Sequence, residues 1–183
     1  MADRLQDFQA TVKEQESGGQ VRKALSRSRA LGFAGGVIAV VVILAAVLFL
    51  FIGISRVDGN SMYPTYKDGD TVWFVKSGNS YSCGTVVSIK MPGGDHYIKR
   101  IVAVPGDTVD IRDGKLIVNG KAVDESYANG ETMKAPDGLM VYPYKLPKSK
   151  YFVLGDNREN SADSRTFGPV SSAQIQGRIV GQQ

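Results

Sequence analysis

The stretch His96-Tyr97-Ile98-Lys99-Arg100-Ile101-Val102-Ala103-Val104, residues 96–104, is the clearest signal of the fold. Successive side chains of a β-strand point to opposite faces of the sheet. Lys99 therefore shares one face with Tyr97, Ile101 and Ala103, and Arg100 shares the other face with Ile98 and Val102. Pro105-Gly106-Asp107 ends the run. We expect a strand that places two cations among apolar neighbours.

Shorter β-rich runs, separated by turn residues, lie on both sides of this strand. They cover residues 70–75, 84–89, 109–111, 115–118, 151–154 and 175–180. Asp113-Gly114 and Asn119-Gly120 are dipeptides that favour tight hairpin turns. Residues 124–150, rich in Lys, Pro and Gly, favour a loop or a small excursion. The sequence predicts one mainly β domain without internal repeats or long helices.

An apolar run of 24 residues without a charge, Leu31–Ile54, precedes this domain. At a rise of about 1.5 Å per residue, a helix of this length exceeds the roughly 30 Å hydrocarbon core of a bilayer. A buried helix of a soluble protein is one alternative. A cleaved signal peptide is another, because Gly53-Ile54-Ser55 is a small-x-small triplet, but the run is longer than an ordinary signal core. We favour a single transmembrane anchor.

The charges beside the apolar run predict its orientation. Arg22, Lys23, Arg27 and Arg29 stand on the N-terminal side without an acidic residue among them, whereas Arg56 is balanced by Asp58 on the other side. Positive flanks stay in the cytoplasm. The prediction is a cytoplasmic tail over residues 1–30, an anchor in the cell membrane over residues 31–54, and an extracytoplasmic domain over residues 55–183.

Composition narrows the possible chemistry. The chain of 183 residues has one His and one Cys, so most metal sites and thiol mechanisms are excluded, and Cys83 can form no disulfide within the chain. The formal net charge of +4 is small, and the basic residues form no stripe, so we expect no nucleic-acid partner. We also expect no cofactor and no metal.

Lys99 is the first candidate for chemistry. Burial disfavours the charged form of an amine, so a lysine among apolar side chains can become a neutral general base, whereas an arginine cannot. The alternative is an edge strand from which both Lys99 and Arg100 extend their charged ends into water. The periodicity alone leaves both interpretations open.

Ser61 is the second candidate. It follows Gly59-Asn60, which tolerate unusual backbone geometry, and Pro64 restricts the chain just after it. A rigid turn that exposes one hydroxyl suits a nucleophile, but serine needs an adjacent base. The candidate bases are His96 and Lys99, and a purely structural turn is the alternative.

A third cluster, residues 155–165, is dense in short polar side chains: GDNRENSADSR. Such oxygens can ligate calcium, but two arginines intrude and the bidentate Glu of an EF-hand is missing. A loop held by Asp–Arg pairs is the alternative, and such a loop could position a catalytic side chain.

Taken together, these segments resemble the ordered sequence boxes of type I signal peptidases. The matching segments are residues 61–65 (SMYPT), 69–72 (GDTV), 97–100 (YIKR) with 105–107 (PGD), and 155–158 (GDNR) through 161–165 (SADSR). The order is the same, and the match extends from the anchor to Phe167-Gly168. The short interval between the last two boxes resembles the compact Gram-positive form.

The resemblance implies a catalytic role for two residues and a supporting role for a third. Ser61 matches the nucleophile and Lys99 matches the neutral general base. Ser161 matches a serine whose hydroxyl orients that lysine. Gly59 is a departure, because some relatives carry there a serine that donates to the oxyanion. The oxyanion would then rely on the Ser61 N–H and another donor.

The resemblance also implies supporting and substrate-binding residues. A salt-bridge cluster is matched by Asp163, Arg165 and Arg100. The small pockets for the P1 and P3 residues of the substrate are matched by Met62, Tyr97 and Ile98.

The predicted function is therefore that of a membrane-anchored serine endopeptidase that removes signal peptides from secreted preproteins after a small-x-small motif. Its partners would be these signal peptides and the lipid bilayer, which we expect Trp73-Phe74 and Met62-Tyr63 to touch; the oligomeric state stays open. The alternatives are a self-cleaving Ser/Lys protease of the repressor-like class and a non-catalytic, membrane-tethered β adaptor.

Overall fold

The computed structural model describes residues 35–182, apart from residues 77 and 79. The chain forms two compact units, Met1–Leu48 and Phe49–Gln183. The predicted tail over residues 1–30 and the first part of the predicted anchor, residues 31–34, lie outside the described residues.

Residues 35–51 form a helix whose apolar side chains are mostly exposed, among them Ile38, Ile43 and Phe49. Of the described residues, 35–76, 78 and 80–182, none belongs to a helix that is long and apolar enough to cross a membrane.

The predicted helix over residues 31–54 is wrong at its C-terminal end. Residues 52–54 belong to strand β1, Ile52–Arg56, which pairs antiparallel with β2, Thr71–Val75. Gly53 lies opposite Phe74, whose ring occupies the space that any side chain at Gly53 would need. The apolar pattern continues past the helix because these residues pack in a sheet, so apolar character alone does not mark the boundary.

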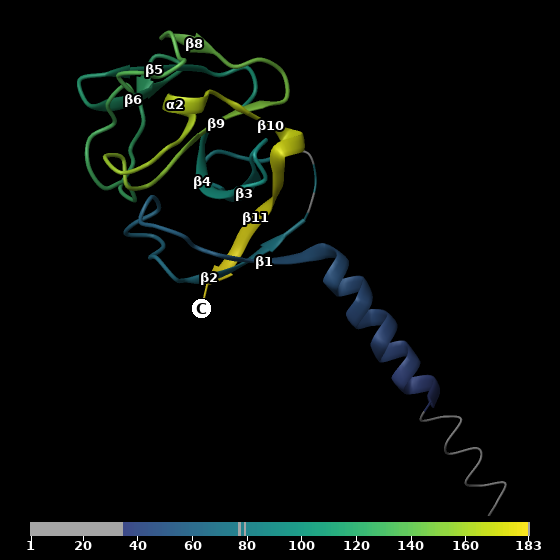
Figure 1. Cartoon of the computed structure of the whole chain (residues 1–183). Coiled ribbons are helices and arrows are strands. Elements are labelled where there is room, and N and C mark those ends of the chain that lie inside the picture. The colour runs from purple at the N-terminus through teal and green to yellow at the C-terminus, as the bar shows by residue number, and fades with distance from the viewer. Residues whose placement is uncertain (1–34, 77, 79, 183) are drawn as a thin grey trace, which may run out of the picture. The chain divides into compact units, whose positions relative to one another are not determined.

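The main sheet has seven antiparallel strands in the order β1-β2-β11-β3-β4-β9-β10 (Figure 1). The other strands are β3, Val86–Lys90; β4, His96–Ala103; β9, Lys150–Leu154; β10, Val170–Ser171; and β11, Ile175–Gln182. The predicted strand at residues 96–104 is confirmed as β4. The last strand, β11, separates the β1–β2 hairpin from β3.

A second sheet of four strands, in the order β7-β6-β5-β8, accounts for the middle of the chain. Its strands are β5, Thr108–Arg112; β6, Lys115–Val118; β7, Lys121–Ala122; and β8, Tyr144–Lys145. The predicted hairpin is confirmed, since Asp113 and Gly114 have φ values of 49° and 70°, as a two-residue hairpin turn of this type requires.

Among the described residues after β1, helical structure is limited to two short segments. They are α2, Ser164–Phe167, and the 3-10 turn η1, Ser172–Gln174. The prediction that no long helix follows the apolar run holds for the described residues of this domain.

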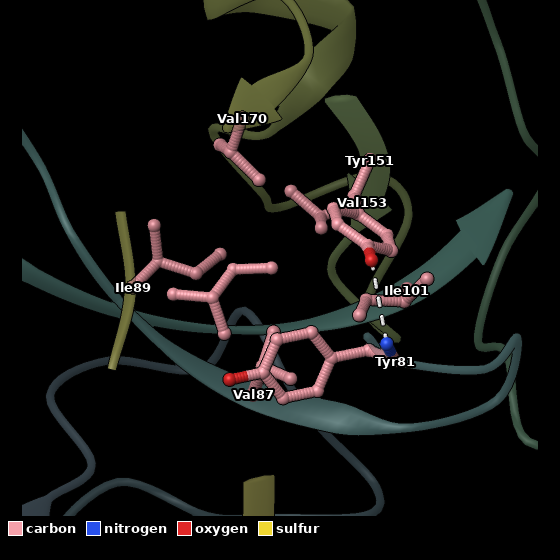
Figure 2. Packing of buried hydrophobic residues seen from close by; sticks show 8 residues of the cluster. Tyr81, Val87, Ile89, Ile101, Tyr151, Val153 and Val170 are labelled. Carbon is pink, nitrogen blue, oxygen red and sulfur yellow. Dashed lines mark hydrogen bonds between the residues drawn. The ribbon is translucent and has the colours of Figure 1, made fainter. Parts of the chain in front are cut away.

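One hydrophobic cluster joins β3, β4, β9, β10 and the first residue of β11 (Figure 2). Val87, Ile101 and Val153 come together there with no exposed surface. Tyr151 adds a polar link, because its hydroxyl accepts a hydrogen bond from the Tyr81 N–H at 3.3 Å, drawn as a dashed line in Figure 2. This packing fixes β4, which carries Lys99.

The predicted alternation of β4 fails at its end. The pairing of β4 with β9 shifts register between Ile101 and Ala103. Ile101 belongs to the cluster of Figure 2, whereas Val102 and Ala103 both pack in a second cluster. Ala103 therefore does not share the face of Lys99 and Ile101, because an irregularity in the strand interrupts the period of two.

The predicted bilayer contact is wrong for two of its four residues. Met62 and Phe74 are buried in the protein, whereas Tyr63 and Trp73 are 44% and 39% exposed. Met62 packs in a third cluster with Val72 and other core residues. Alternation along β2 explains the difference between Trp73 and Phe74, since neighbouring side chains of a strand face opposite sides.

Candidate active site

Ser61 lies in the loop between β1 and β2. The base of this loop is closed by a hydrogen bond of 2.8 Å from the Val57 N–H to the Asp70 carbonyl. Gly59 adopts a φ of 78°, a left-handed conformation that favours glycine, and its N–H donates to Asp68 Oδ1 at 2.8 Å. The predicted rigid turn before Ser61 is therefore present.

The segment after β9 holds this turn from the other side. The Asn157 N–H donates to the Ser61 carbonyl at 3.0 Å, and Asn157 Nδ2 donates to the Asn60 carbonyl at 3.1 Å. The Thr65 hydroxyl donates to Asp156 Oδ2 at 2.6 Å. Three contacts from two consecutive residues thus fix the backbone on both sides of the candidate nucleophile.

Lys99 and Ser61 lie in direct contact. A hydrogen bond of 2.6 Å joins Lys99 Nζ to Ser61 Oγ, and Lys99 is only 4% exposed. Burial lowers the pKa of Lys99 to about 8, against the opposing effects of Asp163 and Asp156, while Arg165 lowers it further. The amine therefore loses its proton far more easily than an exposed lysine does, and the alternative of a cation extending into water is wrong for Lys99.

His96, the other candidate base, lines the same cavity but is exposed. Within the described part of the chain, the side chain that bonds Ser61 Oγ is that of Lys99. The geometry therefore selects lysine and leaves histidine at the rim.

The resemblance had implied that Arg100 joins the salt bridge of Asp163 and Arg165. In the structure it does not. Its guanidinium binds Asp156 through two hydrogen bonds, Nε to Oδ1 at 2.8 Å and Nη2 to Oδ2 at 2.6 Å. The reason lies in the register, since Arg100 pairs with Leu154 of β9, two residues before Asp156. The expected cluster is thus two separate ion pairs.

Asp163 and Arg165 form the second pair, as predicted. Arg165 Nε and Nη2 each donate to Asp163 at 2.8 Å, and both residues are buried. Asp163 also caps the N-terminus of α2 and accepts a hydrogen bond of 3.1 Å from the Gly155 N–H. This pair fixes the chain after residue 160 against the end of β9.

Ser161, the predicted orienting residue, does not contact Lys99 through a hydrogen bond. Its Oγ is buried and has no partner among the described residues. It lies against Gly155, where an added Cβ would overlap both Ser161 Oγ and the carbonyl oxygen of Ser61. The backbone of Gly155 therefore packs directly behind the nucleophile.

A cavity of about 250 Å³ opens over Ser61 and Lys99. Met62, Tyr97 and Ile98, the three predicted substrate-binding residues, all line it. Met62 and Ile98 are buried, so they present apolar walls and leave little room for a large side chain. A chain with small apolar side chains fits such a site.

Gly59 supplies no hydroxyl to the site, because it has no side chain. The hydrogen bonds between described residues include none donated by the Ser61 N–H. That N–H belongs to the nucleophile itself and is available to an oxygen of a bound carbonyl group.

The calcium-loop alternative for residues 155–165 is wrong. Asp156 and Asp163 are each paired with a guanidinium, that of Arg100 and that of Arg165. Across residues 35–182 without 77 and 79, no three acidic, His or Cys side chains gather as metal ligands would. The short polar side chains hold the loop together instead.

Two residues near the site, Glu125 and Tyr127, could not be found from the sequence. Arg158, which is 2% exposed, binds both oxygens of Glu125 at 2.7 Å. The Tyr127 ring lies 4.1 Å from the guanidinium carbon of Arg100. Both residues come from the segment 124–150, for which the sequence predicted only a loop or a small excursion.

Comparisons with known proteins show the family of this chain. The model of the family described as signal peptidase, peptidase S26, matches residues 31–181. The chain is 42% identical over 152 residues to signal peptidase I S of Bacillus subtilis (strain 168), covering 77% of this chain and 81% of that protein. It is 37% identical over 164 residues to signal peptidase I of Bacillus amyloliquefaciens, covering 85% and 88%.

A third relative comes from another genus. Signal peptidase IB of Staphylococcus aureus (strain Mu50) is 40% identical over 140 residues, covering 67% of this chain and 73% of that protein. A solved signal peptidase I of Enterococcus faecalis V583 is 32% identical, with a TM-score of 0.44, covering 57% of this chain and 100% of the solved chain.

Proposed function

Since the chain belongs to the type I signal peptidases of Gram-positive type, serine proteases of family S26, we propose that Ser61 and neutral Lys99 cleave signal peptides from secreted preproteins. The observation that carries the assignment is the 2.6 Å contact between Lys99 Nζ and Ser61 Oγ. A nucleophile and a base within hydrogen-bond reach are the minimum for acyl transfer by a serine.

The proposed reaction has two steps that use the same two side chains. Ser61 Oγ attacks the scissile carbonyl carbon while Lys99 takes the hydroxyl proton, and the oxyanion accepts a hydrogen bond from the Ser61 N–H. The Lys99 ammonium then protonates the leaving amine as the peptide bond breaks. In the second step Lys99 accepts a proton from the water that attacks the acyl ester, and it returns this proton to Ser61 Oγ as the ester bond breaks and the product carboxylic acid leaves.

Substrate selection would follow from the cavity walls. Met62 and Ile98 are buried and cannot retreat without disturbing the third hydrophobic cluster, in which both take part. A side chain larger than alanine at the cleavage position would therefore overpack the site. Family membership also argues against the non-catalytic adaptor as an alternative.

The test of the proposed function uses the full chain in detergent and a preprotein with alanine at positions −3 and −1 of the cleavage site. We expect cleavage after position −1, and we expect leucine at −1 to lower kcat/KM by at least roughly 100-fold. The matched control is leucine at −2, which we expect to be cut almost as fast as alanine. Equal cleavage of the −1 and −2 variants, or cleavage elsewhere, would contradict the proposal.

The pH dependence should report the proton on Lys99. The pKa of Lys99 is lowered to about 8, and the protonated amine cannot act as a base, so activity is lost as pH falls below that value. We expect kcat/KM to fall about tenfold per pH unit at pH values below this pKa, which gives the profile an acid limb, and to level off at higher pH. A profile of kcat/KM from pH 6 to pH 10 measures this, and a flat profile between pH 6 and pH 8 would rule out Lys99 as the base.

We also propose that the apolar run up to residue 51 anchors the protein in the cell membrane, with residues 1–30 in the cytoplasm and the β domain outside. The uncharged sequence, the cationic N-terminal flank and the exposed apolar side chains of the helix at 35–51 support this. Trp73 and Tyr63 stay candidates for contact with the bilayer.

Protease added to intact cells from which the wall has been removed tests the orientation. We expect digestion of the β domain and protection of an epitope fused before residue 1. Protection of both parts, or digestion of the epitope without lysis, would contradict the proposed topology.

A further inference from the structure

Tyr127 lies outside the cavity over Ser61 and Lys99, yet its ring packs on the ion pair behind Lys99. We propose that Tyr127 is a positioning residue: by stacking on Arg100 it holds the Arg100–Asp156 pair in place and so sets the pH range in which Lys99 works as a base. This inference rests on the proposed function, because it assumes that Lys99 is the base.

The geometry around Tyr127 is that of an aromatic ring between two guanidinium groups. The guanidinium carbon of Arg100 lies 4.1 Å from the ring centroid and that of Arg158 lies 5.9 Å from it. The Tyr127 hydroxyl donates to Glu125 Oε1 at 3.0 Å, and Glu125 in turn binds Arg158. The ring is therefore fixed at its edge and presents its face to Arg100, the closer of the two cations.

The segment that carries Tyr127 is attached to the active-site loop by its backbone. The Asn129 N–H donates to the Asp156 carbonyl at 2.7 Å, and the Arg158 N–H donates to the Asn129 carbonyl at 2.9 Å. Residues 125–129 consequently cover the Arg100–Asp156 pair. Asp156 has no exposed surface, and the side chain of Arg100 is 12% exposed.

The hydrogen bonds of Arg100 are made with other residues. Tyr127 therefore supports the Arg100 guanidinium by stacking alone. Arg100 Nη1 donates to the Gly84 carbonyl at 2.8 Å, and its Nε and Nη2 bind Asp156. These bonds use the N–H groups of the guanidinium, whereas the contact with Tyr127 places the guanidinium carbon over the ring at 4.1 Å. Removal of the ring should therefore loosen the pair and admit water without breaking it.

Lys99 responds to this pair through charge and solvent. The charged and titratable groups that face Lys99 are Asp163, Asp156 and Arg165 around Nζ, with the Tyr97 ring at 5.4 Å on its own strand. The carboxylate of Asp156 favours the charged amine, and both of its oxygens are bound by the Arg100 guanidinium. A looser pair and added water both favour the ammonium, so both changes raise the pKa of Lys99.

The experiment compares Tyr127→Leu with Tyr127→Phe in the full chain in detergent. Loss of the ring in the leucine variant should move the acid limb of the kcat/KM profile upward by about half a pH unit, while the plateau at high pH stays within about twofold of wild type. At pH values below the limb this is a loss of about threefold. The phenylalanine variant keeps the ring face and should keep the wild-type limb.

Tyr144→Leu is the matched control, because Tyr144 is a partly buried tyrosine of β8 that packs against the second hydrophobic cluster. The Tyr144→Leu variant should keep the acid limb of the kcat/KM profile at the wild-type pH. An unchanged limb in Tyr127→Leu would overturn the inference, and so would an equal shift in Tyr127→Phe. A uniform loss at all pH values would assign Tyr127 to stability alone and would overturn it too.

Tyr127→Met provides a second test if the leucine variant does not fold, since methionine fills irregular space and also lacks a ring. It should show the same upward shift as leucine. If neither variant folds while Tyr127→Phe does, Tyr127 is a structural residue and the inference fails.

The role of Tyr127 and the role of Lys99 as base can be tested separately. Loss of the base in a Lys99 variant abolishes cleavage at every pH, whereas Tyr127→Leu only displaces the limb. An unshifted limb in Tyr127→Leu beside an inactive Lys99 variant removes the inference and keeps the proposed function. An active Lys99 variant removes both.

Discussion

Replacement of Lys99 by methionine is expected to lower the cleavage of a preprotein by at least about 10³-fold at every pH, because Ser61 then has no base within reach. Methionine keeps most of the volume and the apolar stem of lysine, so the buried site should remain filled. Lys99→Arg should be equally inactive, since a guanidinium cannot give up its proton at any working pH. The measurement is kcat/KM with the substrate that has alanine at −3 and −1.

Lys90→Met is the matched control for this prediction. Lys90 ends β3 in an exposed position, so the same substitution there should leave cleavage unchanged. Ser61→Ala should lose about as much activity as Lys99→Met, and the double variant should lose no more, because the two side chains act as one unit. More than a tenth of wild-type activity in Lys99→Met would refute the assigned base.

Gly155→Ala is expected to have the second largest effect. An alanine Cβ at this position would overlap Ser161 Oγ and Cβ, and also the carbonyl oxygen of Ser61. The hydroxyl can rotate away, but the carbonyl belongs to the backbone that carries the nucleophile and is held by the Asn157 N–H. Ser61 must therefore shift, and a displacement of about 1 Å is enough to lower kcat/KM by roughly 100-fold.

Gly181→Ala is the control for this substitution, because an added Cβ there would meet no atom within 4 Å. We expect Gly155→Ala to lower the free energy of unfolding by about 1–3 kcal/mol as well, from overpacking, and Gly181→Ala to leave it almost unchanged. Thermal unfolding followed by circular dichroism measures the loss of stability, and kcat/KM measures the loss of activity. Wild-type activity in Gly155→Ala would mean that the loop moves freely and that the nucleophile is not held by this packing.

Local patterns were sufficient to predict most strands. In β4 the alternation of side chains between the two faces of the strand separates Lys99 from Arg100, and in the β5–β6 hairpin Asp113-Gly114 provides the positive φ values that the turn needs. Such features depend on neighbours in the sequence. Local patterns left both His96 and Lys99 as possible bases for Ser61, and the resemblance to a family selected Lys99, 38 residues away.

What could not be predicted depends on contacts between distant segments. Residues 52–54 look like the end of an apolar helix until β2 is placed beside them. The partner of Arg100 follows from the register of β4 against β9, which also contains the irregularity at Ala103. Tyr127 is one of eight tyrosines, and nothing in its neighbourhood along the chain indicates that it lies on Arg100.

The strand order of the main sheet has a consequence for the time at which the sheet can be completed. The β1–β2 hairpin carries Ser61, β4 carries Lys99, and the ladder of hydrogen bonds between them runs through β11, the last strand of the chain. A protein made from its N-terminus presents both reactive side chains well before it can complete this ladder. The pairing that joins β2 to β3 can therefore form only after residues 175–182 have been made, long after Ser61 and Lys99.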